Sequence, residues 1–287
     1  MISNNNNNNN NNNTVWYITG ASSGVGLALS QELINQGYNV AGTSRKLANI
    51  KDKINNDRFL PLEVDLIDEN SVIQSLKKTV EKFGKLDVVV NNAAQVIIGA
   101  FEEFTDKELR ESFDSNYFGP SNVIRNALVY LRPQGHGLIY NISSIGGYAG
   151  YPFWGSYGPT KFSLSGLSEV LHNELKPFGI QVVSLNLGMT RTPIHNVILF
   201  SKNEIPIYKS REAIEKYYKF TESYPYTDPS KLAVLLIQLS KESDLPSNIF
   251  VGEDSNQRAK EKIALVNESI NKYEKRAGTD ILESKKV

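Results

Sequence analysis

Residues 15–26, with the sequence VWYITGASSGVG, decide the fold. The first five residues of this stretch are aromatic or β-branched and predict a buried strand. Three glycines follow in the spacing G-x-x-x-G-x-G, and from Gly24 apolar residues recur at helical spacing until Gly37. A strand that turns through glycines directly into a helix is typical of the start of an open α/β sheet.

The same alternation of strand and helix continues along the chain. Further strands are predicted at residues 39–43, 59–64, 87–91, 137–142, 181–187 and 248–251. Helices are predicted at residues 24–36, 68–83, 106–130 and 228–240, and another long helix within residues 152–178. The predicted strands are largely apolar, which favours a parallel sheet buried on both faces. Right-handed crossovers then predict a single-domain α/β fold, a doubly wound parallel sheet with helices on both faces, of the Rossmann-like kind.

Composition excludes several classes of protein. The 287 residues contain 31 Lys plus Arg and 31 Asp plus Glu, so the chain lacks the excess positive charge on which general nucleic-acid binding depends. There is no cysteine, which excludes thiolate metal sites and cysteine nucleophiles, and we expect no metal site. Because we find no apolar stretch of the ~20 residues that span a membrane and no signal region, we expect a cytoplasmic protein without a membrane span.

Three segments depart from the alternation. Residues 1–13 include ten consecutive asparagines and are expected to be disordered, leaving a folded domain over residues 14–255. Residues 192–226 interrupt the pattern with prolines and tyrosines, as substrate lids often do. Residues 256–287 are polar, with a surface helix predicted over residues 257–275 and frayed residues after it.

The glycine-rich turn has the composition of a dinucleotide site. Its free N–H groups and the positive end of the following helix stabilise a pyrophosphate. Glycines also serve tight turns without any ligand, but the position between first strand and first helix favours a cofactor. The residues expected to contact it here are Gly20, Ser22, Ser23, Gly24, Val25 and Gly26.

The end of the second strand indicates which dinucleotide binds. NAD enzymes place an acidic residue there for the ribose hydroxyl, whereas NADP enzymes offer Arg to the 2′-phosphate. Here Ser44 stands at the acidic position and Arg45 and Lys46 follow it. We therefore predict NADP(H) rather than NAD(H), the alternative being that Arg45 is a solvated surface charge.

A tyrosine and a lysine stand four residues apart, at Tyr157 and Lys161, and share one face if a helix includes both. A nearby ammonium stabilises a phenolate, so such a tyrosine can exchange the proton that accompanies hydride transfer at a carbonyl or alcohol. The spacing alone is common and more often structural. However, Asn91 ends one predicted strand and Ser144 follows the next. The carboxyl ends of parallel strands share one edge, together with the glycine turn.

Taken together, these motifs resemble the short-chain dehydrogenase/reductase family in its compact one-domain form, most closely the branch around steroid and retinol dehydrogenases. The likeness covers about residues 15–188 and weakens towards Gly252. It rests on TGASSGVG at residues 19–26, Asp65, Asn-Asn-Ala-Ala at residues 91–94, Asn116, Ser144, Tyr157 and Lys161.

The resemblance implies a role for each catalytic position. Tyr157 is the general acid/base, and Lys161 lowers the pKa of Tyr157 and binds the nicotinamide ribose. Ser144, thirteen residues before Tyr157, binds the substrate oxygen. Asn116 supports a water in a proton relay with Lys161. The two helical regions carrying Asn116 and Tyr157 form the interface of a homodimer or homotetramer in many members.

The resemblance also implies cofactor contacts beyond the glycine turn. Asp65 and Leu66 meet the adenine, Asn91 shapes the site, and Gly188 and Thr192 lie at the nicotinamide. Two positions depart from the family. Ala94 replaces the last glycine of Asn-Asn-Ala-Gly, and Leu187 replaces the proline of Pro-Gly. Neither change removes a reacting group.

The substrate is expected to be a small molecule with a carbonyl or alcohol group, and a lipophilic one. The predicted pocket lies between residues 146–154 and the insertion, with side chains that also suit ordinary packing: Tyr148, Tyr151, Phe153, Trp154, Met189, Ile194, Val197, Ile198, Leu199 and Phe200. His195 is interpreted as a surface or hydrogen-bonding residue. The alternative functions are a non-catalytic NADP(H) sensor and, with less support, an epimerase or dehydratase.

Overall fold

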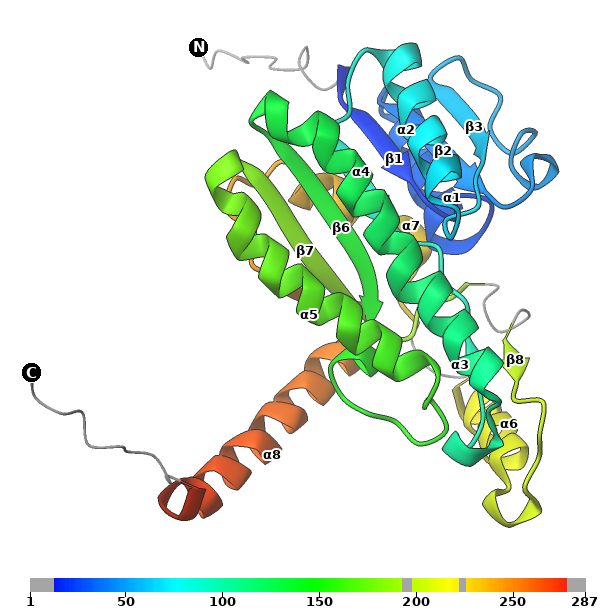
Figure 1. Ribbon diagram of the computed structural model, residues 1–287, viewed down its shortest axis with the longest axis vertical. Helices are drawn as coiled ribbons and strands as arrows, with labels where there is room; N and C mark the ends of the chain where they lie inside the picture. Colours follow the sequence, from blue (N-terminus) through cyan, green and yellow to red (C-terminus); the bar gives the residue numbers. More distant parts are fainter. Residues whose placement is uncertain (1–12, 193–197, 222–225, 278–287) are drawn as a thin grey trace, which may run out of the picture.

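A parallel seven-stranded sheet forms the centre of the molecule in a computed structural model that describes residues 13–192, 198–221 and 226–277 (Figure 1). The strand order is β3-β2-β1-β4-β6-β7-β9, and neighbouring strands pair in parallel. The strands are β1 (Val15–Ile18), β2 (Asn39–Ser44), β3 (Phe59–Glu63), β4 (Val88–Asn91), β6 (Gly137–Ser144), β7 (Ile180–Leu187) and β9 (Asn248–Val251). The predicted single-domain, doubly wound fold is confirmed.

Helices cover both faces of this sheet (Figure 1). α1 (Gly24–Asn35) and α7 (Pro229–Leu239) pack on one face, and α2 (Glu69–Phe83), α4 (Gly119–Gln134) and α5 (Tyr157–Leu175) pack on the other. The local sequence sets their ends: the Asp68 carboxylate accepts a hydrogen bond from Asn70 N (2.9 Å) at the start of α2, and Gly84 ends that helix at φ 82°.

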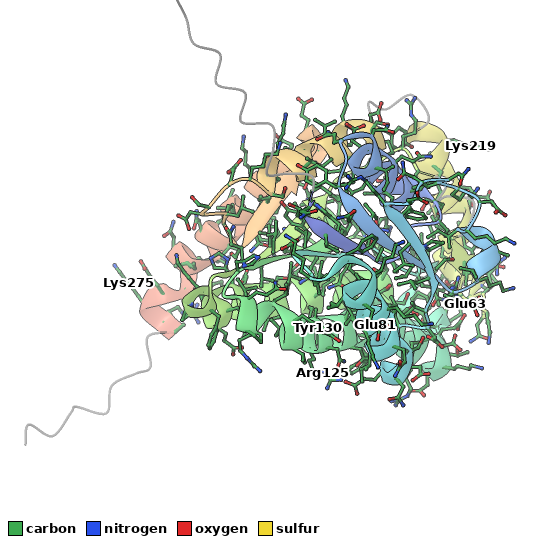
Figure 2. The ribbon with its side chains drawn as sticks, turned by 90° about the horizontal axis from the view of Figure 1, so that it is seen from above. Glu63, Glu81, Arg125, Tyr130, Lys219 and Lys275 are labelled. Atoms are coloured by element: carbon green, nitrogen blue, oxygen red, sulfur yellow. The ribbon has the colours of Figure 1, made fainter. Side chains whose placement is uncertain are left out.

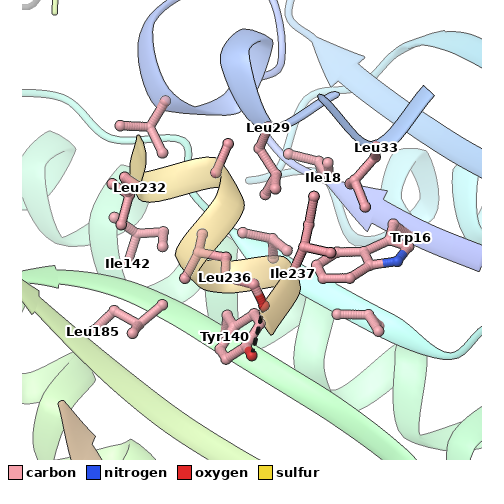
Figure 3. Packing of buried hydrophobic residues seen from close by; sticks show 14 of the residues in the cluster. Trp16, Ile18, Leu29, Leu33, Tyr140, Ile142, Leu185, Leu232, Leu236 and Ile237 are labelled. Atoms are coloured by element: carbon pink, nitrogen blue, oxygen red, sulfur yellow. Dashed lines mark hydrogen bonds between the residues drawn. The ribbon is translucent and has the colours of Figure 1, made fainter. Parts of the chain in front are cut away.

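The core explains why the strands are apolar along their whole length. In β1, Trp16 and Ile18 pack against one helical layer, whereas Tyr17 between them packs against the other. The first layer is shown in Figure 3, where the Tyr140 hydroxyl donates to the carbonyl of Leu236 in α7 at 3.2 Å. Each such buried aliphatic or aromatic side chain contributes about 1.5–3 kcal/mol to folding.

Several boundaries differ from the sequence prediction. The helix predicted over residues 106–130 is divided into α3 (Asp106–Phe113), a π-helical turn (Asp114–Phe118) and α4. The helix predicted within residues 152–178 is α5, which begins at Tyr157, after Pro152 and the left-handed backbone of Phe153 (φ 68°). The surface helix predicted over residues 257–275 is α8 (Glu253–Ala277).

The insertion contains structure that the sequence did not predict. β8 (Leu199–Phe200) pairs in parallel with β5 (Ile97–Ile98), and α6 (Ser210–Thr221) follows. The predicted lid therefore includes a helix next to α3 (Figure 1). Apart from residue 13, the asparagine tract lies outside the described residues.

α8 extends away from the sheet, with Lys275 near its far end (Figure 2). Of the helices in the described ranges, none combines the length and apolar character needed to cross a membrane.

Candidate active site

The turn between β1 and α1 approaches other backbone closely at its glycines. Gly20 has φ 66°, and a Cβ there would lie 2.9 Å from the Cα of Ala93. A Cβ on Gly26 would lie 2.5 Å from the carbonyl oxygen of Gly20. The turn also joins β2, because Ala21 N donates to the carbonyl of Thr43 at 2.9 Å. Side chains at these positions would collide with Ala93 and with the carbonyl of Gly20, so glycine is required for the shape of the turn.

Asn92 holds this turn in place. Its Nδ2 donates to the carbonyls of Thr19 (2.9 Å) and Gly20 (3.1 Å), while the backbone N–H groups of Asn92 and Ala93 donate to Thr19 Oγ1. The sequence analysis assigned the site to Asn91, whose Nδ2 instead donates to Asn141 Oδ1 inside the sheet (2.8 Å). Asn92 was missed, although its place directly after a strand was a usable indication. A role for Asn91 at the cofactor stays a prediction.

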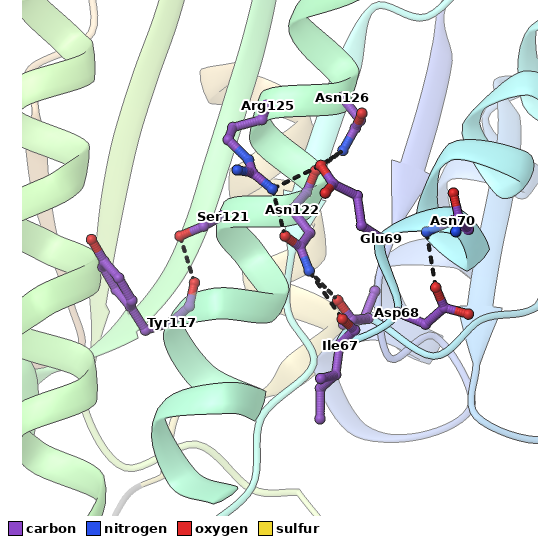
Figure 4. Close-up of polar contacts among 10 residues, drawn as sticks. Ile67, Asp68, Glu69, Asn70, Tyr117, Ser121, Asn122, Arg125 and Asn126 are labelled. Atoms are coloured by element: carbon purple, nitrogen blue, oxygen red, sulfur yellow. Dashed lines mark hydrogen bonds and ion pairs between the residues drawn. The ribbon is translucent and has the colours of Figure 1, made fainter. Parts of the chain in front are cut away.

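Two cationic residues follow β2, and an ordered loop follows β3. Arg45 and Lys46 are exposed after the buried Ser44, and the carboxylate of Glu63 on β3 accepts a hydrogen bond from Leu47 N at 2.7 Å. After β3, the Asp65 carboxylate accepts from Ile67 N at 3.0 Å. Asn122 of α4 donates to the carbonyls of Leu66 and Ile67 (Figure 4). The two residues predicted to meet the adenine are thus held in a fixed loop.

Asn116 lies in the π-helical turn between α3 and α4 and is fully buried. Its Oδ1 accepts from Gln95 N (2.8 Å), and its Nδ2 donates to the Gln95 carbonyl (2.8 Å) and to Thr160 Oγ1 (3.2 Å). Turns of this kind often occur at functional sites. Asn116 therefore links the loop after β4 to the first turn of α5, the turn that carries Tyr157 and leads to Lys161.

Ser144, Tyr157 and Lys161 meet at the carboxyl end of β6. The Tyr157 hydroxyl is hydrogen-bonded to Ser144. The Lys161 ammonium lies 5.6 Å from the centre of the Tyr157 ring and donates to the carbonyl of Ile142 at 2.8 Å. The neighbouring Ser143 faces a different group, the Ser165 hydroxyl at 2.9 Å. The structure therefore brings Ser144 to Tyr157 and turns Ser143 towards Ser165, and the catalytic role of Ser144 stays a prediction.

Burial controls the protonation of this group. It raises the pKa of Tyr157 from about 10 to about 12, against a smaller lowering by the Ser144 hydrogen bond. Burial also lowers the pKa of Lys161 from 10.5 to about 8. Without a bound cofactor, Tyr157 is therefore a neutral phenol at neutral pH, and desolvation outweighs the lowering that the sequence analysis expected from Lys161.

These residues face a cavity of about 190 Å³ with a predominantly apolar lining. Several predicted positions line it: Ser144, Tyr151, Trp154, Tyr157, Lys161, Gly188, Met189, Thr192 and Ile198. Others lie elsewhere, since Tyr148 stacks on Phe250, Leu199 is half exposed and Phe200 lies beneath Arg211. Ile194, His195 and Val197 lie outside the described residues.

Two parts of the cavity wall were not predicted from the sequence. Tyr217 and Tyr218 reach it from α6, a helix that was not predicted. Asp254, at the start of α8, accepts from Met189 N at 2.7 Å and occupies the space that a side chain at Gly188 would need. In the parts of the chain that the structure describes, there is no cluster of His, Cys, Asp and Glu suited to a metal.

A sequence model described as short chain dehydrogenase matches residues 14–200. The chain belongs to this family of oxidoreductases. The chain is 31% identical to Oxidoreductase BOA17 of Botryotinia fuckeliana over 263 residues, which cover 90% of this chain and 96% of that protein. It is also 40% identical over 171 residues to a 3-ketodihydrosphingosine reductase of Bacteroides thetaiotaomicron, covering 60% of this chain and 62% of that protein.

One solved structure agrees with this assignment. A short-chain dehydrogenase from Streptomyces avermitilis superposes with a TM-score of 0.86 at 32% identity, covering 93% of this chain and 98% of that one. ElxO, solved with NADP bound, shares the fold at 22% identity with a TM-score of 0.70, covering 83% of this chain and 96% of that one. The placement near steroid and retinol dehydrogenases stays a prediction.

Proposed function

We propose that this short-chain dehydrogenase uses NADP(H) to interconvert a lipophilic carbonyl compound and its alcohol. The observation that carries the proposal is the meeting of Ser144, Tyr157 and Lys161 at one end of an apolar cavity. The hydroxyls of Ser144 and Tyr157, beside the buried Lys161 ammonium, can bind a carbonyl oxygen and deliver a proton to it.

The concave glycine turn supports a dinucleotide. Gly20 and Gly26 leave no room for side chains, as a backbone that approaches a pyrophosphate requires. Residues proposed to hold the cofactor are Gly20, Ser22, Ser23, Gly24, Val25, Gly26, Arg45, Asp65, Leu66, Asn91, Tyr157, Lys161, Gly188 and Thr192, to which the structure adds Asn92. When bound, the nicotinamide supplies or accepts the hydride.

The preference for NADP(H) rests on the exposed Arg45 and on Ser44, which stands where NAD enzymes have an acidic residue.

The protein's own groups handle the proton. In reduction, the neutral Tyr157 phenol donates a proton to the carbonyl oxygen while the Ser144 hydroxyl donates a hydrogen bond to the same oxygen. The Lys161 ammonium stabilises the phenolate that remains. Asn116 acts through the hydrogen bond to Thr160, and a water beside it is proposed to pass a proton towards Lys161.

The cavity favours a lipophilic substrate. Trp154, Ile198 and Met189 form apolar parts of its wall, and the lining as a whole is predominantly apolar. Reduction of a ketone is also named for the Bacteroides thetaiotaomicron relative. Residues 198–226 are proposed to act as the lid, since α6 and Tyr226 supply part of the wall.

A homodimer or homotetramer formed through α4 and α5 remains part of the proposal. Val129 on α4 and Phe162 and Val170 on α5 are 59%, 42% and 52% exposed, so these helices carry apolar side chains on the outside of the single chain. Exposed apolar side chains on neighbouring elements are typical of subunit contacts.

The test is turnover of NADPH, followed by its absorbance, with a panel of aliphatic and cyclic ketones and aldehydes. We expect oxidation of NADPH with lipophilic carbonyls and a higher KM for NADH. Reaction with small polar sugars alone would contradict the lipophilic assignment. Tight NADPH binding without turnover on any carbonyl would instead favour the non-catalytic sensor.

A further inference from the structure

A second cavity adjoins the candidate active site. Its volume is about 200 Å³, similar to that of the first. Eight residues line it, and none carries a charge: Tyr151, Pro152, Phe153, Trp154, Ala213, Ile214, Tyr217 and Tyr218. Apart from tyrosine hydroxyls its side chains are apolar, so it suits a hydrocarbon group and offers nothing to an ionised one.

The two cavities share a wall of four aromatic residues: Tyr151, Trp154, Tyr217 and Tyr218. Trp154 connects this wall to the reacting group, because its ring centre lies 5.4 Å from that of Tyr157. The second cavity therefore begins one aromatic ring away from the proposed proton donor. A molecule whose carbonyl meets Tyr157 extends towards this wall if it continues past Trp154.

The backbone beneath the second cavity is held in an unfavourable conformation. Phe153 has φ 68°, a left-handed value that non-glycine residues seldom adopt. The segment is fixed by a hydrogen bond from Gly99 N to the Phe153 carbonyl (3.0 Å) and by the bridge between Gly99 and Trp154. Such strain persists where surrounding structure imposes it, and it is concentrated at binding sites. Here it places Phe153 in the cavity wall.

The size of the cavities supports a joint role. Each is smaller than the ~300–1,000 Å³ of common small-molecule sites, and the two together reach that range. From these observations we infer that the substrate carries an unbranched hydrocarbon chain, and that the cavity between residues 151–154 and α6 binds this chain while the carbonyl lies at Tyr157. This inference deepens the proposed carbonyl reduction and rests on it for the position of the reacting end.

The first experiment measures kcat/KM for methyl ketones from 2-hexanone to 2-tetradecanone with saturating NADPH, each below its solubility limit. Each methylene that enters an apolar site increases affinity by about fourfold at most. We expect kcat/KM to rise by two- to fourfold per methylene and to level off when the second cavity is full. A flat series, with measurable turnover of the short ketones, would overturn the inference and leave the proposed function intact.

A substitution in the second cavity then distinguishes binding of the chain in that cavity from a non-specific preference for hydrophobic substrates. Ala213 lines only this cavity and lies on α6, so Ala213→Phe fills the space without a glycine or proline effect. We expect the ratio of kcat/KM for 2-dodecanone to that for 2-hexanone to fall at least tenfold. The matched control, Glu215→Phe on an exposed position of the same helix, should keep the ratio. If Ala213→Phe does not fold by circular dichroism, Ala213→Leu replaces it.

A binding assay makes the outcome independent of turnover. The chain has two tryptophans, and Trp16 is fully buried in the core, so ligand-dependent emission changes report on Trp154. Titration with 1-dodecanol should quench or shift this emission at lower concentration than 1-hexanol, and Ala213→Phe should remove the difference. If that pattern appears without turnover of any ketone, the second cavity binds the hydrocarbon chain as inferred, but the proposed carbonyl reduction is contradicted. An unchanged preference in Ala213→Phe would overturn the site.

Discussion

Replacement of Gly26 by alanine tests whether the turn before α1 is shaped by contact. The new methyl carbon would lie 2.5 Å from the carbonyl oxygen of Gly20 and 2.6 Å from Nδ2 of Asn92. Both distances are far shorter than van der Waals contact. Because Leu29 and Leu33 fix α1 in the core, the clash must be relieved at the turn.

The size of the effect follows from what must move. Displacing Asn92 removes its hydrogen bonds to Thr19 and Gly20, each contributing about 0.5–1.5 kcal/mol. Overpacking adds about 1–3 kcal/mol, and the better helix propensity of alanine offsets about 1 kcal/mol. We expect Gly26→Ala to lower the free energy of unfolding by about 1–5 kcal/mol. The Kd for NADPH should rise at least tenfold, since the turn no longer fits a pyrophosphate.

Urea unfolding followed by circular dichroism and titration of NADPH fluorescence measure the two quantities. Gly166→Ala is the matched control, because Gly166 lies in α5 with no atom within 4 Å of its Cβ position. It should gain about 0.5–1 kcal/mol of stability and leave the Kd unchanged. A Gly26→Ala protein with wild-type stability and NADPH affinity would refute the reasoning.

Three further predictions concern other positions. Arg45→Asp should raise the KM for NADPH by about 10–100-fold in steady-state assays without raising the KM for NADH. Equal increases in both KM values would show that Arg45 does not recognise the 2′-phosphate. Burial raises the pKa of Glu103, but hydrogen bonds from Ile205 N, Ser210 and Ala100 N together lower it. The stability it adds is therefore present above the unfolded pKa of about 4.3 and lost as pH falls below it. Glu103→Gln should lower the free energy of unfolding by about 1–3 kcal/mol at pH 7, measured by urea unfolding. The free energy of unfolding of this variant should also fall less steeply as the pH drops below about 4.3. Since burial raises the pKa of Tyr157 to about 12, kcat/KM for alcohol oxidation should rise close to tenfold from about pH 6 to 7 and then level off near pH 8, where Lys161 loses its proton. A flat profile over the rising part of this range would argue against phenolate chemistry.

The strands of the central sheet could be predicted from the sequence because they have local patterns. Apolar segments separated by helices predicted the seven strands of this sheet, but not β5 and β8. The spacing of Tyr157 and Lys161 predicted that they share one face of a helix, and the common edge of a parallel sheet predicted that Ser144, which ends β6, lies close to them. The catalytic roles of these residues stay predictions.

The missed features depend on contacts between distant segments. α6 has an amphipathic pattern that is hidden among prolines and tyrosines, and β5 and β8 are two residues each, too short for any period. The roles of Asn92 and Asp254 arise from hydrogen bonds to Gly20 and Met189, and no local pattern predicts such pairs. The balance between burial and charge at Tyr157 also required the packed structure.

The most direct test of the central claim is single-turnover reduction of a lipophilic ketone by wild-type protein and by Tyr157→Phe, with NADPH binding measured in parallel. The substitution removes one hydroxyl and keeps the ring beside Trp154. We predict that Tyr157→Phe binds NADPH with nearly unchanged Kd and loses at least 100-fold in the rate of NADPH oxidation. A Tyr157→Phe protein that oxidises NADPH at the wild-type rate would contradict the assignment of Tyr157 as the proton donor.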